Sequence, residues 1–308
     1  MRLRLVDLDH SLTGQPALQQ AVAAGHAQLL DCNAGGEALR LWANQSSMRQ
    51  FARTMRDAPP PPGRGPTVTF LGSGDYHHLA SALIGAVEVP VTVLHFDNHP
   101  DWVRFPPAYH CGSWVNRILE LPQVARVVTI GPCSDDLTRP QIKGGNLPAL
   151  AAGKLEIFPW RHAPSRVWGR IGSGAGHRQQ DGYLVWRNVG GAAWDDFLDD
   201  LLGRLPTDDV WISIDKDVLA PADAVTNWDQ GEMPLQALLG ALSRIAAAKR
   251  IVGVDICGDY APPRFRNPLK RVAARLDHPA ATVMANGALR RNASTNERLL
   301  AVLQELAA

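Results

Sequence analysis

The chain contains short apolar runs rich in β-branched residues, and three of them are almost continuously hydrophobic. These three lie around Val91, Val127 and Ile251. A strand of this composition is typical of a parallel sheet that is covered on both faces by helices. The full set of expected strands is Thr67–Leu71, Val89–Leu94, Val124–Ile130, Asp209–Ile214 and Arg250–Ile256.

Stretches that suit helices alternate with these runs. They are His77–Val87, Gly112–Leu121, Leu235–Lys249 and Asn296–Ala307. The alternation predicts a doubly wound, three-layer α/β/α fold with a mainly parallel central sheet and right-handed crossovers.

The 308 residues are expected to form a single domain with an atypical N-terminal segment at about 1–66. The proline-rich stretch Arg56–Pro66 predicts a loop or extended connector. Residues 162–182 are rich in Gly, Arg and Ser and are expected to form a long surface excursion.

Composition excludes several classes of partner. Thirty-one basic and 30 acidic residues leave a net charge of +1, so no electrostatic excess favours nucleic acid or an anionic membrane. The four cysteines form no CxxC pair, which favours a reduced, cytoplasmic setting over a zinc knuckle or redox dithiol. We expect no signal peptide, and the apolar runs are shorter than the roughly 20 residues of a membrane span.

Clusters of His and Asp follow three of the expected strands. The sequences are GSGDYHH (72–78), HFDNHPDW (95–102) and DKDVLAP (215–221). Because ligands of open α/β sheets bind at the carboxyl ends of strands, these clusters are the candidate site. Period-two spacing within Asp97, His99 and Asp101, and within Asp215 and Asp217, would turn each set to one side if the backbone stayed extended.

The donor set is mostly carboxylate with two imidazoles. It suits Mn²⁺ or a related divalent ion better than structural zinc. Four carboxylates without cations would repel one another and take up protons, whereas two neighbouring ions would offset the charge and generate a nucleophilic hydroxide. Each cluster alone could simply cap a helix or form a turn, and it is their occurrence at three strand ends that favours a metal site.

The three clusters resemble the arginase/agmatinase (ureohydrolase) family of dinuclear manganese hydrolases. Tyr76-His77-His78-Leu79-Ala80 is similar to the first family motif, with His77 as ligand. Asp97, His99 and Asp101 match its Asp-x-His-x-Asp motif, and Ser213, Asp215 and Asp217 match its Ser-x-Asp-x-Asp motif. The resemblance covers about residues 67–263 and implies an arginase-like fold.

The resemblance also implies a role for each ligand. His77 and Asp101 would hold one Mn²⁺ ion, and His99 and Asp217 the other, while Asp97 and Asp215 would bridge both. A hydroxide between the ions would attack a trigonal carbon, and Asp101 would orient it. His110 occupies the place of the family's proton shuttle. A His suits this role because its pKa is near neutral and it can protonate a departing amine.

Departures from the family pattern concern the substrate. The family's guanidinium-binding Glu is absent, and Asp259 is the expected substitute. The loop after Asp217 carries Trp228 and Asp229, which are further candidate substrate contacts, as is Arg104. The Asn, Ser and Thr residues that hold the carboxylate of free arginine are missing, so arginine is not the expected substrate. Lys216 should point away from the metals, and it needs an acidic partner unless its strand lies nearer the edge of the sheet.

The expected function is therefore hydrolysis of a C–N bond in a linear amidine or guanidino compound, with release of urea. Two alternatives stay open: a deacetylase-like amide hydrolase, which typically uses one metal, and a non-catalytic metal-stabilised binding protein. The family also implies a homo-oligomer, commonly a trimer or hexamer.

Overall fold

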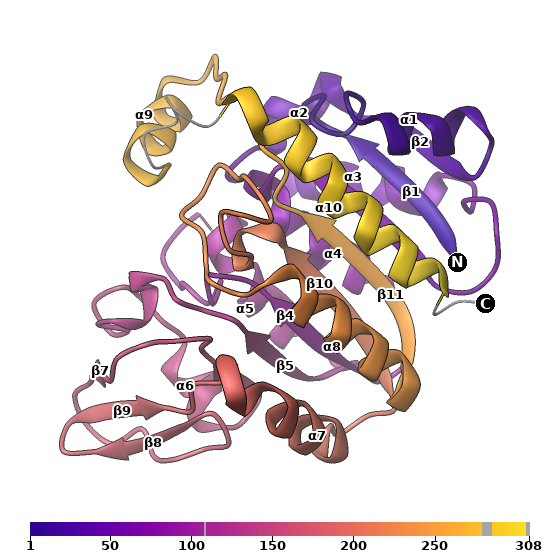
Figure 1. The fold of residues 1–308 in the computed structure, drawn as a ribbon. Coiled ribbons are helices and arrows are strands. Elements are labelled where there is room, and N and C mark those ends of the chain that lie inside the picture. Colours follow the sequence, from indigo (N-terminus) through magenta and orange to yellow (C-terminus); the bar gives the residue numbers. More distant parts are fainter. Residues whose placement is uncertain (108, 279–284, 306–308) are drawn as a thin grey trace.

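In a computed structural model of the chain, residues 1–107, 109–278 and 285–305 are described. The order of the central sheet is β2-β1-β3-β11-β10-β4-β5-β6, and all neighbouring strands are parallel (Figure 1). In chain order, its strands are β1 (Arg2–Asp7), β2 (Ala27–Asp31), β3 (Thr67–Gly72), β4 (Val91–Phe96), β5 (Val124–Ile130), β6 (Leu155–Phe158), β10 (Asp209–Asp215) and β11 (Arg250–Cys257).

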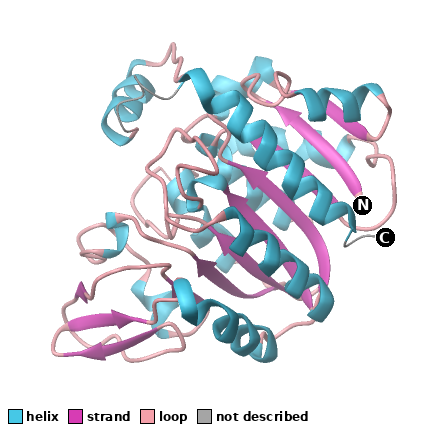
Figure 2. Cartoon of the chain, in the orientation of Figure 1, coloured by secondary structure: helices cyan, strands magenta, loops and turns pink. Residues whose placement is uncertain are grey.

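Helices cover both faces of this sheet, as the ribbon drawings show (Figures 1 and 2). One apolar core contains side chains of α1 (Pro16–Ala23), α7 (Trp194–Arg204), α8 (Leu235–Ala248) and α10 (Ala285–Glu305). The opposite core contains side chains of α2 (Asn33–Leu39), α3 (Gln45–Asp57), α4 (Ala80–Ile84), α5 (Trp114–Leu119) and α6 (Leu147–Ala151). The three-layer α/β/α architecture is confirmed.

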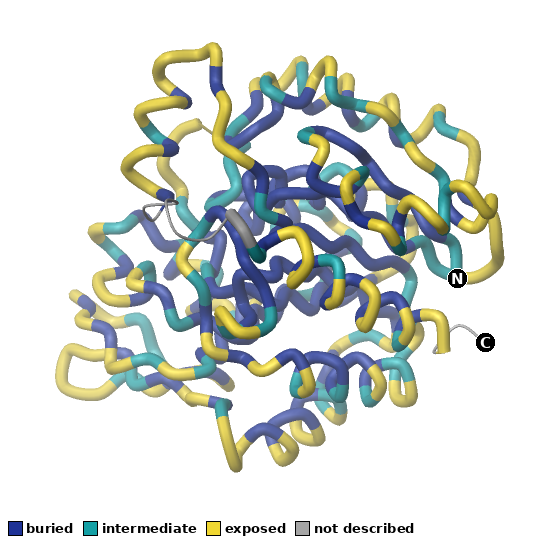
Figure 3. The backbone as a smooth tube through the Cα atoms, turned by 45° about the horizontal axis from the view of Figure 1, so that its top comes forward, coloured by how far each residue is buried: buried dark blue, intermediate teal, exposed yellow. Residues whose placement is uncertain are grey.

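Burial explains the strand and helix patterns. Every residue of β4 and β10 is buried, as expected for strands between two helical layers. In α8, the buried residues include Leu235, Leu238, Leu239 and Leu242, whose spacing places them on one face of a helix. Figure 3 shows the buried backbone in the interior and the exposed residues on outer loops and helix surfaces.

The expected strands correspond to β3, β4, β5, β10 and β11, with β5 at the expected bounds. The sequence did not predict β1 and β2. Arg2 and Arg4 interrupt the apolar pattern of β1, and β2 is a short strand with few apolar residues. Arg4 in β1 is nevertheless buried. Its guanidinium group tolerates burial because it donates to Gln28 Oε1 at 2.8 Å and to the carbonyl of Pro59. The N-terminal segment thus supplies two strands of the main sheet.

Two expected helices differ at their N-terminal ends. The stretch expected at His77–Val87 is a 3₁₀ helix, η1 (Gly74–Leu79), followed by the short α4. Cys111–Ser113 forms the 3₁₀ helix η2 before α5. The helix expected at Asn296–Ala307 lies within α10, and its residues 306 and 307 fall outside the described part.

The 162–182 excursion has structure of its own. It contains β7 (Ser165–Arg166) and β8 (His177–Gln180), which pair with β9 (Tyr183–Trp186) in a small antiparallel sheet. The connector after α3 has no helix or strand before β3, as expected. The remaining α-helix, α9 (Pro268–Asp277), precedes α10 in the chain, and its Ala274 packs with Leu41 and Phe265 in a small apolar cluster (Figure 1). In the described ranges, no helix combines the length and apolar character that crossing a membrane requires.

Candidate metal centre

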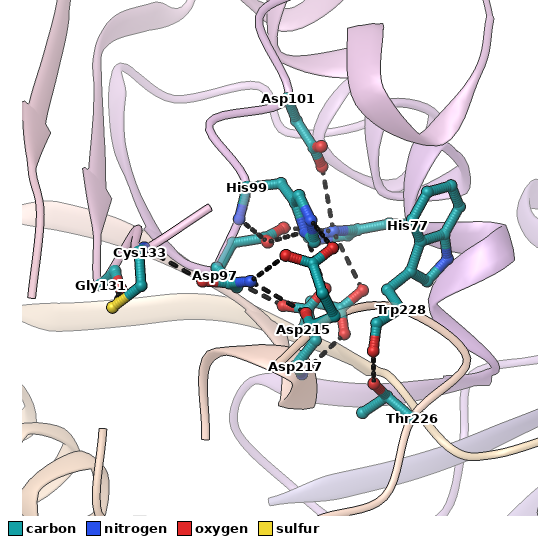
Figure 4. Close-up of polar contacts among 12 residues, drawn as sticks. His77, Asp97, His99, Asp101, Gly131, Cys133, Asp215, Asp217, Thr226 and Trp228 are labelled. Carbon is teal, nitrogen blue, oxygen red and sulfur yellow. Dashed lines mark hydrogen bonds and ion pairs between the residues drawn. The ribbon is translucent and has the colours of Figure 1, made fainter. Parts of the chain in front are cut away.

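Four adjacent strands of the sheet, β3, β11, β10 and β4, carry the candidate site at their carboxyl ends. His77 follows β3, Asp215 ends β10, and Asp97 directly follows β4. Figure 4 shows the side chains of the six expected ligands converging from these strand ends. The structure therefore brings together all six: His77, Asp97, His99, Asp101, Asp215 and Asp217.

His77 is held by a buried relay. Its Nε2 lies 2.8 Å from Ser213 Oγ, which donates its single hydroxyl hydrogen to Asp255 Oδ1 at 2.8 Å. Ser213 must therefore accept from Nε2–H of His77, so the neutral form of the ring carries its lone pair on Nδ1. This Nδ1 faces the cluster, 3.0 Å from Asp97 Oδ2 and 3.3 Å from Asp101 Oδ2. It is buried and has no hydrogen-bond partner among the described residues, as expected of an atom that awaits a cation.

The Asp-x-His-x-Asp segment converges by bending. We expected extended backbone, but β4 ends at Phe96 and the next residues form bends. The backbone N–H of His99 donates to Asp97 Oδ1 at 2.6 Å, and Asp101 has a left-handed φ of 47°. Trp114 Nε1 then donates to Asp101 Oδ2 at 2.6 Å and fixes that carboxylate. The expectation of period-two alternation is wrong here, although the side chains do meet.

The third cluster also leaves the extended conformation. Asp215 is the last residue of β10, and Asp217 lies in the 3₁₀ helix η5 (Lys216–Val218). The backbone N–H of Asp217 donates to Asp215 Oδ1 at 3.0 Å. Gly74 and Gly258 lie against Asp215, and a Cβ at either position would come within 2.6 Å of its carboxylate oxygens. Only glycine leaves room for this carboxylate at both contacts.

Ligand atoms fall into overlapping groups, each with mutual distances below 4.8 Å. One group contains His77, Asp97 and Asp101 with the additional His95, and a second contains Asp97, His99 and Asp217. Asp97 belongs to both groups, which is the geometry a bridging ligand needs. A third group joins His77 to Asp215 and Cys257.

Crowded carboxylates perturb one another strongly. Burial and the charge of Asp97 raise the pKa of Asp101 to about 8 and also raise that of Asp215. Burial and the charges of Asp215 and Asp97 raise the pKa of Asp217 well above its usual value. Raised pKa values show that crowded negative charge is unfavourable at this position, and a bound dication would offset that charge, so the donor set fits divalent metal.

A cavity of about 360 Å³ opens onto the cluster. Its wall includes Leu41 and Trp42 from the N-terminal segment, Val103 and Phe105 from the loop after Asp101, and Trp228. Among the described lining residues, the carboxylates outside the six-residue cluster are Asp136 and Asp277, and there is no Lys or Arg. The wall is therefore apolar and aromatic, with negative charge as its only permanent charge.

His110 lines this cavity, as a proton shuttle would. An isolated antiparallel β-bridge pairs the backbone of His110 with that of Trp42. The backbone N–H of Ala43 donates to the carbonyl of Tyr109, and that of Cys111 donates to the carbonyl of Leu41. Burial lowers the pKa of His110, while a hydrogen bond with the backbone of Phe105 partly opposes this. The N-terminal segment thus positions the candidate shuttle.

The expectation that Asp259 grips the substrate is wrong. Asp259 is buried and does not line the cavity. Its Oδ1 lies 2.6 Å from Lys216 Nζ and accepts from Gln15 Nε2 at 3.0 Å. Lys216 points away from the metal ligands, and its buried charge needs this counter-charge. The carboxylate of Asp259 therefore pairs with Lys216 and is not placed to bind substrate.

Arg104 and Asp229 are also displaced from their expected roles. Arg104 is exposed and lies outside the cavity wall, and its backbone N–H binds the carbonyl of Gly144. Asp229 Oδ1 lies 2.9 Å from the outer Nε2 of His99 and outside the cavity wall. Trp228 does line the cavity, with its ring 5.8 Å from that of His99 and nearly perpendicular to it (Figure 4).

Sequence reasoning missed several residues around the cluster. His95 Nε2 lies 2.9 Å from Asp97 Oδ2, and its period-two spacing from Asp97 in β4 was an available signal. Cys257 donates its thiol to Asp215 Oδ2 at 3.2 Å, a contact set by strand register that local sequence does not reveal. Asp75 is a buried acceptor for Arg40 Nε and Trp228 Nε1, at 2.7 and 2.9 Å.

Comparison with protein sequences yields one distant relative. No family model matches the chain. An uncharacterised protein of Thermotoga maritima is 30% identical over 198 residues, which are 64% of this chain and 60% of that protein. The match therefore spans less than two thirds of the relative's length.

Comparison with solved structures establishes the fold. Arginase from Entamoeba histolytica, solved with L-ornithine, has a TM-score of 0.58 and 11% identity, with 97% of each chain covered. Arginase from Bacillus cereus has a TM-score of 0.56 and 14% identity, covering 98% of this chain and 97% of that one. Proclavaminate amidino hydrolase from Streptomyces clavuligerus has a TM-score of 0.55 and 14% identity, covering 100% and 92%. The chain has an arginase-like α/β fold.

Proposed function

We propose that the chain is a divergent member of the ureohydrolase family and a dinuclear metal-dependent hydrolase of a linear amidine or guanidino compound. The observation that carries this proposal is the convergence of six His and Asp side chains at the strand ends of an arginase-like sheet. Two of the ligand groups share Asp97, as expected if two ions lie side by side.

The ligands divide between two positions. His77 and Asp101 would hold one ion, His99 and Asp217 the other, and Asp97 and Asp215 would lie between them. Manganese is the ion we propose, because oxygen donors predominate. Two bound divalent ions would supply a nucleophilic water at neutral pH and offset the negative charge of the carboxylates.

The side chains around the metals orient the reactants and move protons. Trp114 Nε1 donates to Asp101 Oδ2 and orients this carboxylate, and Asp101 would accept a hydrogen bond from the attacking water. His110, farther out on the wall, would give a proton to the departing amine. The apolar walls restrict bulk water, which strengthens these polar contacts.

The cavity wall supports a substrate with a cationic or neutral far end. Its described residues offer no Lys or Arg for a carboxylate, whereas Asp136 and Asp277 favour a cation. Burial raises the pKa of Asp277, His278 opposes this, and Asp136 adds a smaller increase, so a cation beside Asp277 would stabilise its ionised form. We therefore propose that free arginine is a poor substrate and that guanidino compounds without a carboxylate are good ones.

The test is urea release from guanidino compounds that differ only at the far end, which is an amine, an amide or a carboxylate. Purified protein is loaded with manganese, and its metal content is measured in parallel. We expect about two ions per chain and faster urea release from the amine and amide compounds. About one ion per chain with hydrolysis of acetylated amines would instead indicate a deacetylase-like enzyme, and metal binding without any turnover would indicate a binding protein.

A further inference from the structure

Asp229 lies on the outer side of His99, away from the substrate cavity. Its Oδ1 is 2.9 Å from His99 Nε2, and its side chain is 56% exposed. On the inner side, His99 Nδ1 lies 2.9 Å from Asp217 Oδ2 and 3.5 Å from Asp97 Oδ1. The ring of His99 therefore joins an outer carboxylate to the inner cluster.

An ionised carboxylate accepts hydrogen bonds and cannot donate one, so contact with Asp229 places the proton of neutral His99 on Nε2. Nδ1 then carries the lone pair, directed at the inner carboxylates. A carboxylate on the outer nitrogen of a ligand histidine fixes its tautomer and orientation and increases its basicity. Asp229 meets the geometric requirement for this role.

Asn98 holds Asp229 in place. Its Nδ2 donates to the carbonyl of Asp229 at 2.9 Å and to Asp229 Oδ2 at 3.2 Å. The Oδ1 of Asn98 accepts from the backbone N–H of Cys133, and the backbone N–H of Asn98 donates to Asp217 Oδ1, both at 3.0 Å. A residue inside the Asp-x-His-x-Asp segment thus ties the loop of Asp229 to the metal ligands.

We propose that Asp229 is the positioning residue for His99 and that the metal position of His99 is the more weakly binding of the two. This inference rests on the proposed dinuclear site. The corresponding relay behind His77, through Ser213 to Asp255, is buried. Water competes for the exposed carboxylate of Asp229 but not for that of Asp255, so the support of His99 is weaker.

The experiment is titration of the metal-free protein with Mn²⁺, followed by calorimetry and by metal analysis after dialysis. The wild-type protein should bind in two distinguishable steps. Asp229→Ala should weaken one step by about 10- to 100-fold, the range typical of outer partners of ligand histidines, and leave the other step unchanged. The Mn²⁺ affinity of Asp229→Asn at the weakened step should lie between those of the wild-type protein and Asp229→Ala. The amide oxygen of Asn still accepts from Nε2–H but carries no charge.

Glu232→Gln is the matched control. Glu232 is an acidic residue of the same loop with a 43% exposed side chain, and it pairs with Arg161 away from the metal centre. It should leave both steps unchanged. Nitrogen-15 NMR of metal-free protein provides a second readout, in which Asp229→Ala should reduce the Nε2–H tautomer of His99.

The outcomes separate this inference from the function. If Asp229→Ala keeps both binding steps and the tautomer of His99, Asp229 is not a positioning residue, and the proposed function is unaffected. If the weakened step is the tighter one, the assigned order of affinities is wrong. If the wild-type protein itself binds fewer than two ions, the dinuclear function fails first.

Discussion

The two proposed ligand histidines, His77 and His99, are supported by contrasting parts of the molecule. We call His77 and the residues that support it, Ser213 and Asp255, the His77 half of the site. Ser213 and Asp255 face each other across the paired strands β10 and β11. We call His99 and its supporting residue Asp229 the His99 half. Asp229 belongs to a loop, and its side chain is largely exposed. Both arrangements leave a ring nitrogen directed at the carboxylates.

The difference shows that one chemical task can be performed by the sheet or by a loop. Register within a parallel sheet fixes Ser213 opposite Asp255, so the His77 half depends on the core of the fold. The exposed side chain of Asp229 belongs to a loop, and loops tolerate sequence changes because few packing contacts constrain them. The His99 half therefore depends less on the core of the fold than the His77 half does.

Asp97→Asn should have the largest effect because both halves share this ligand. We expect activity to be abolished and metal content to fall at both positions, a greater loss than the roughly 10- to 100-fold cost of an outer partner. Urea assays and metal analysis would check this. Normal turnover by this variant would contradict the bridging assignment.

His110→Asn should separate the cavity wall from both halves of the metal centre. We expect turnover to fall by about 10²- to 10⁴-fold, the usual contribution of a general acid, while both metal-binding steps stay intact. Turnover and metal content are measured on the same sample. Loss of metal would instead make His110 a ligand.

Ser213→Ala should affect the His77 half and leave the His99 half unchanged. His77 Nε2 and Asp255 Oδ1 would each lose a buried hydrogen-bond partner, at a cost of about 1–3 kcal/mol in the free energy of unfolding. Metal binding at one position should weaken by about 10- to 100-fold. Denaturant unfolding and Mn²⁺ titration test the two effects. If this variant and Asp229→Ala weaken the same step, the division into halves is wrong.

The pH dependence of stability tests the carboxylate cluster that both halves share, without any substitution. The pKa of Asp101 is raised to about 8 by burial and the charge of Asp97, and the pKa values of Asp215 and Asp217 are also raised. Such groups stabilise the metal-free fold below their unfolded pKa of about 3.9, and this contribution is lost as pH rises through the folded value.

We therefore expect the Tm of metal-free protein to fall between about pH 5 and pH 9. Saturating manganese should remove this fall, because it binds the ionised carboxylates. Thermal unfolding with and without metal measures the difference. A metal-free Tm that stays constant or rises over this range would contradict the raised pKa values.

Sequence patterns predicted the layered α/β fold and the His and Asp clusters at three strand ends, and the family resemblance then selected the six side chains. Continuous apolar runs require burial on both faces, and polar clusters after such runs must meet at one edge of a parallel sheet. These conclusions depend on local composition, which the chain carries in every conformation. The strands β1 and β2 were missed because only tertiary contacts make the buried Arg4 acceptable.

Only the tertiary structure decided what the remaining polar residues do. Asp259 looked like a substrate contact until its carboxylate was found paired with Lys216, and Asp229 until it was found on the outer nitrogen of His99. The sequence places each carboxylate near a strand end but does not say which side it faces. That choice depends on the nearest counter-charge or hydrogen-bond donor, which residues distant in the chain supply once the sheet has formed.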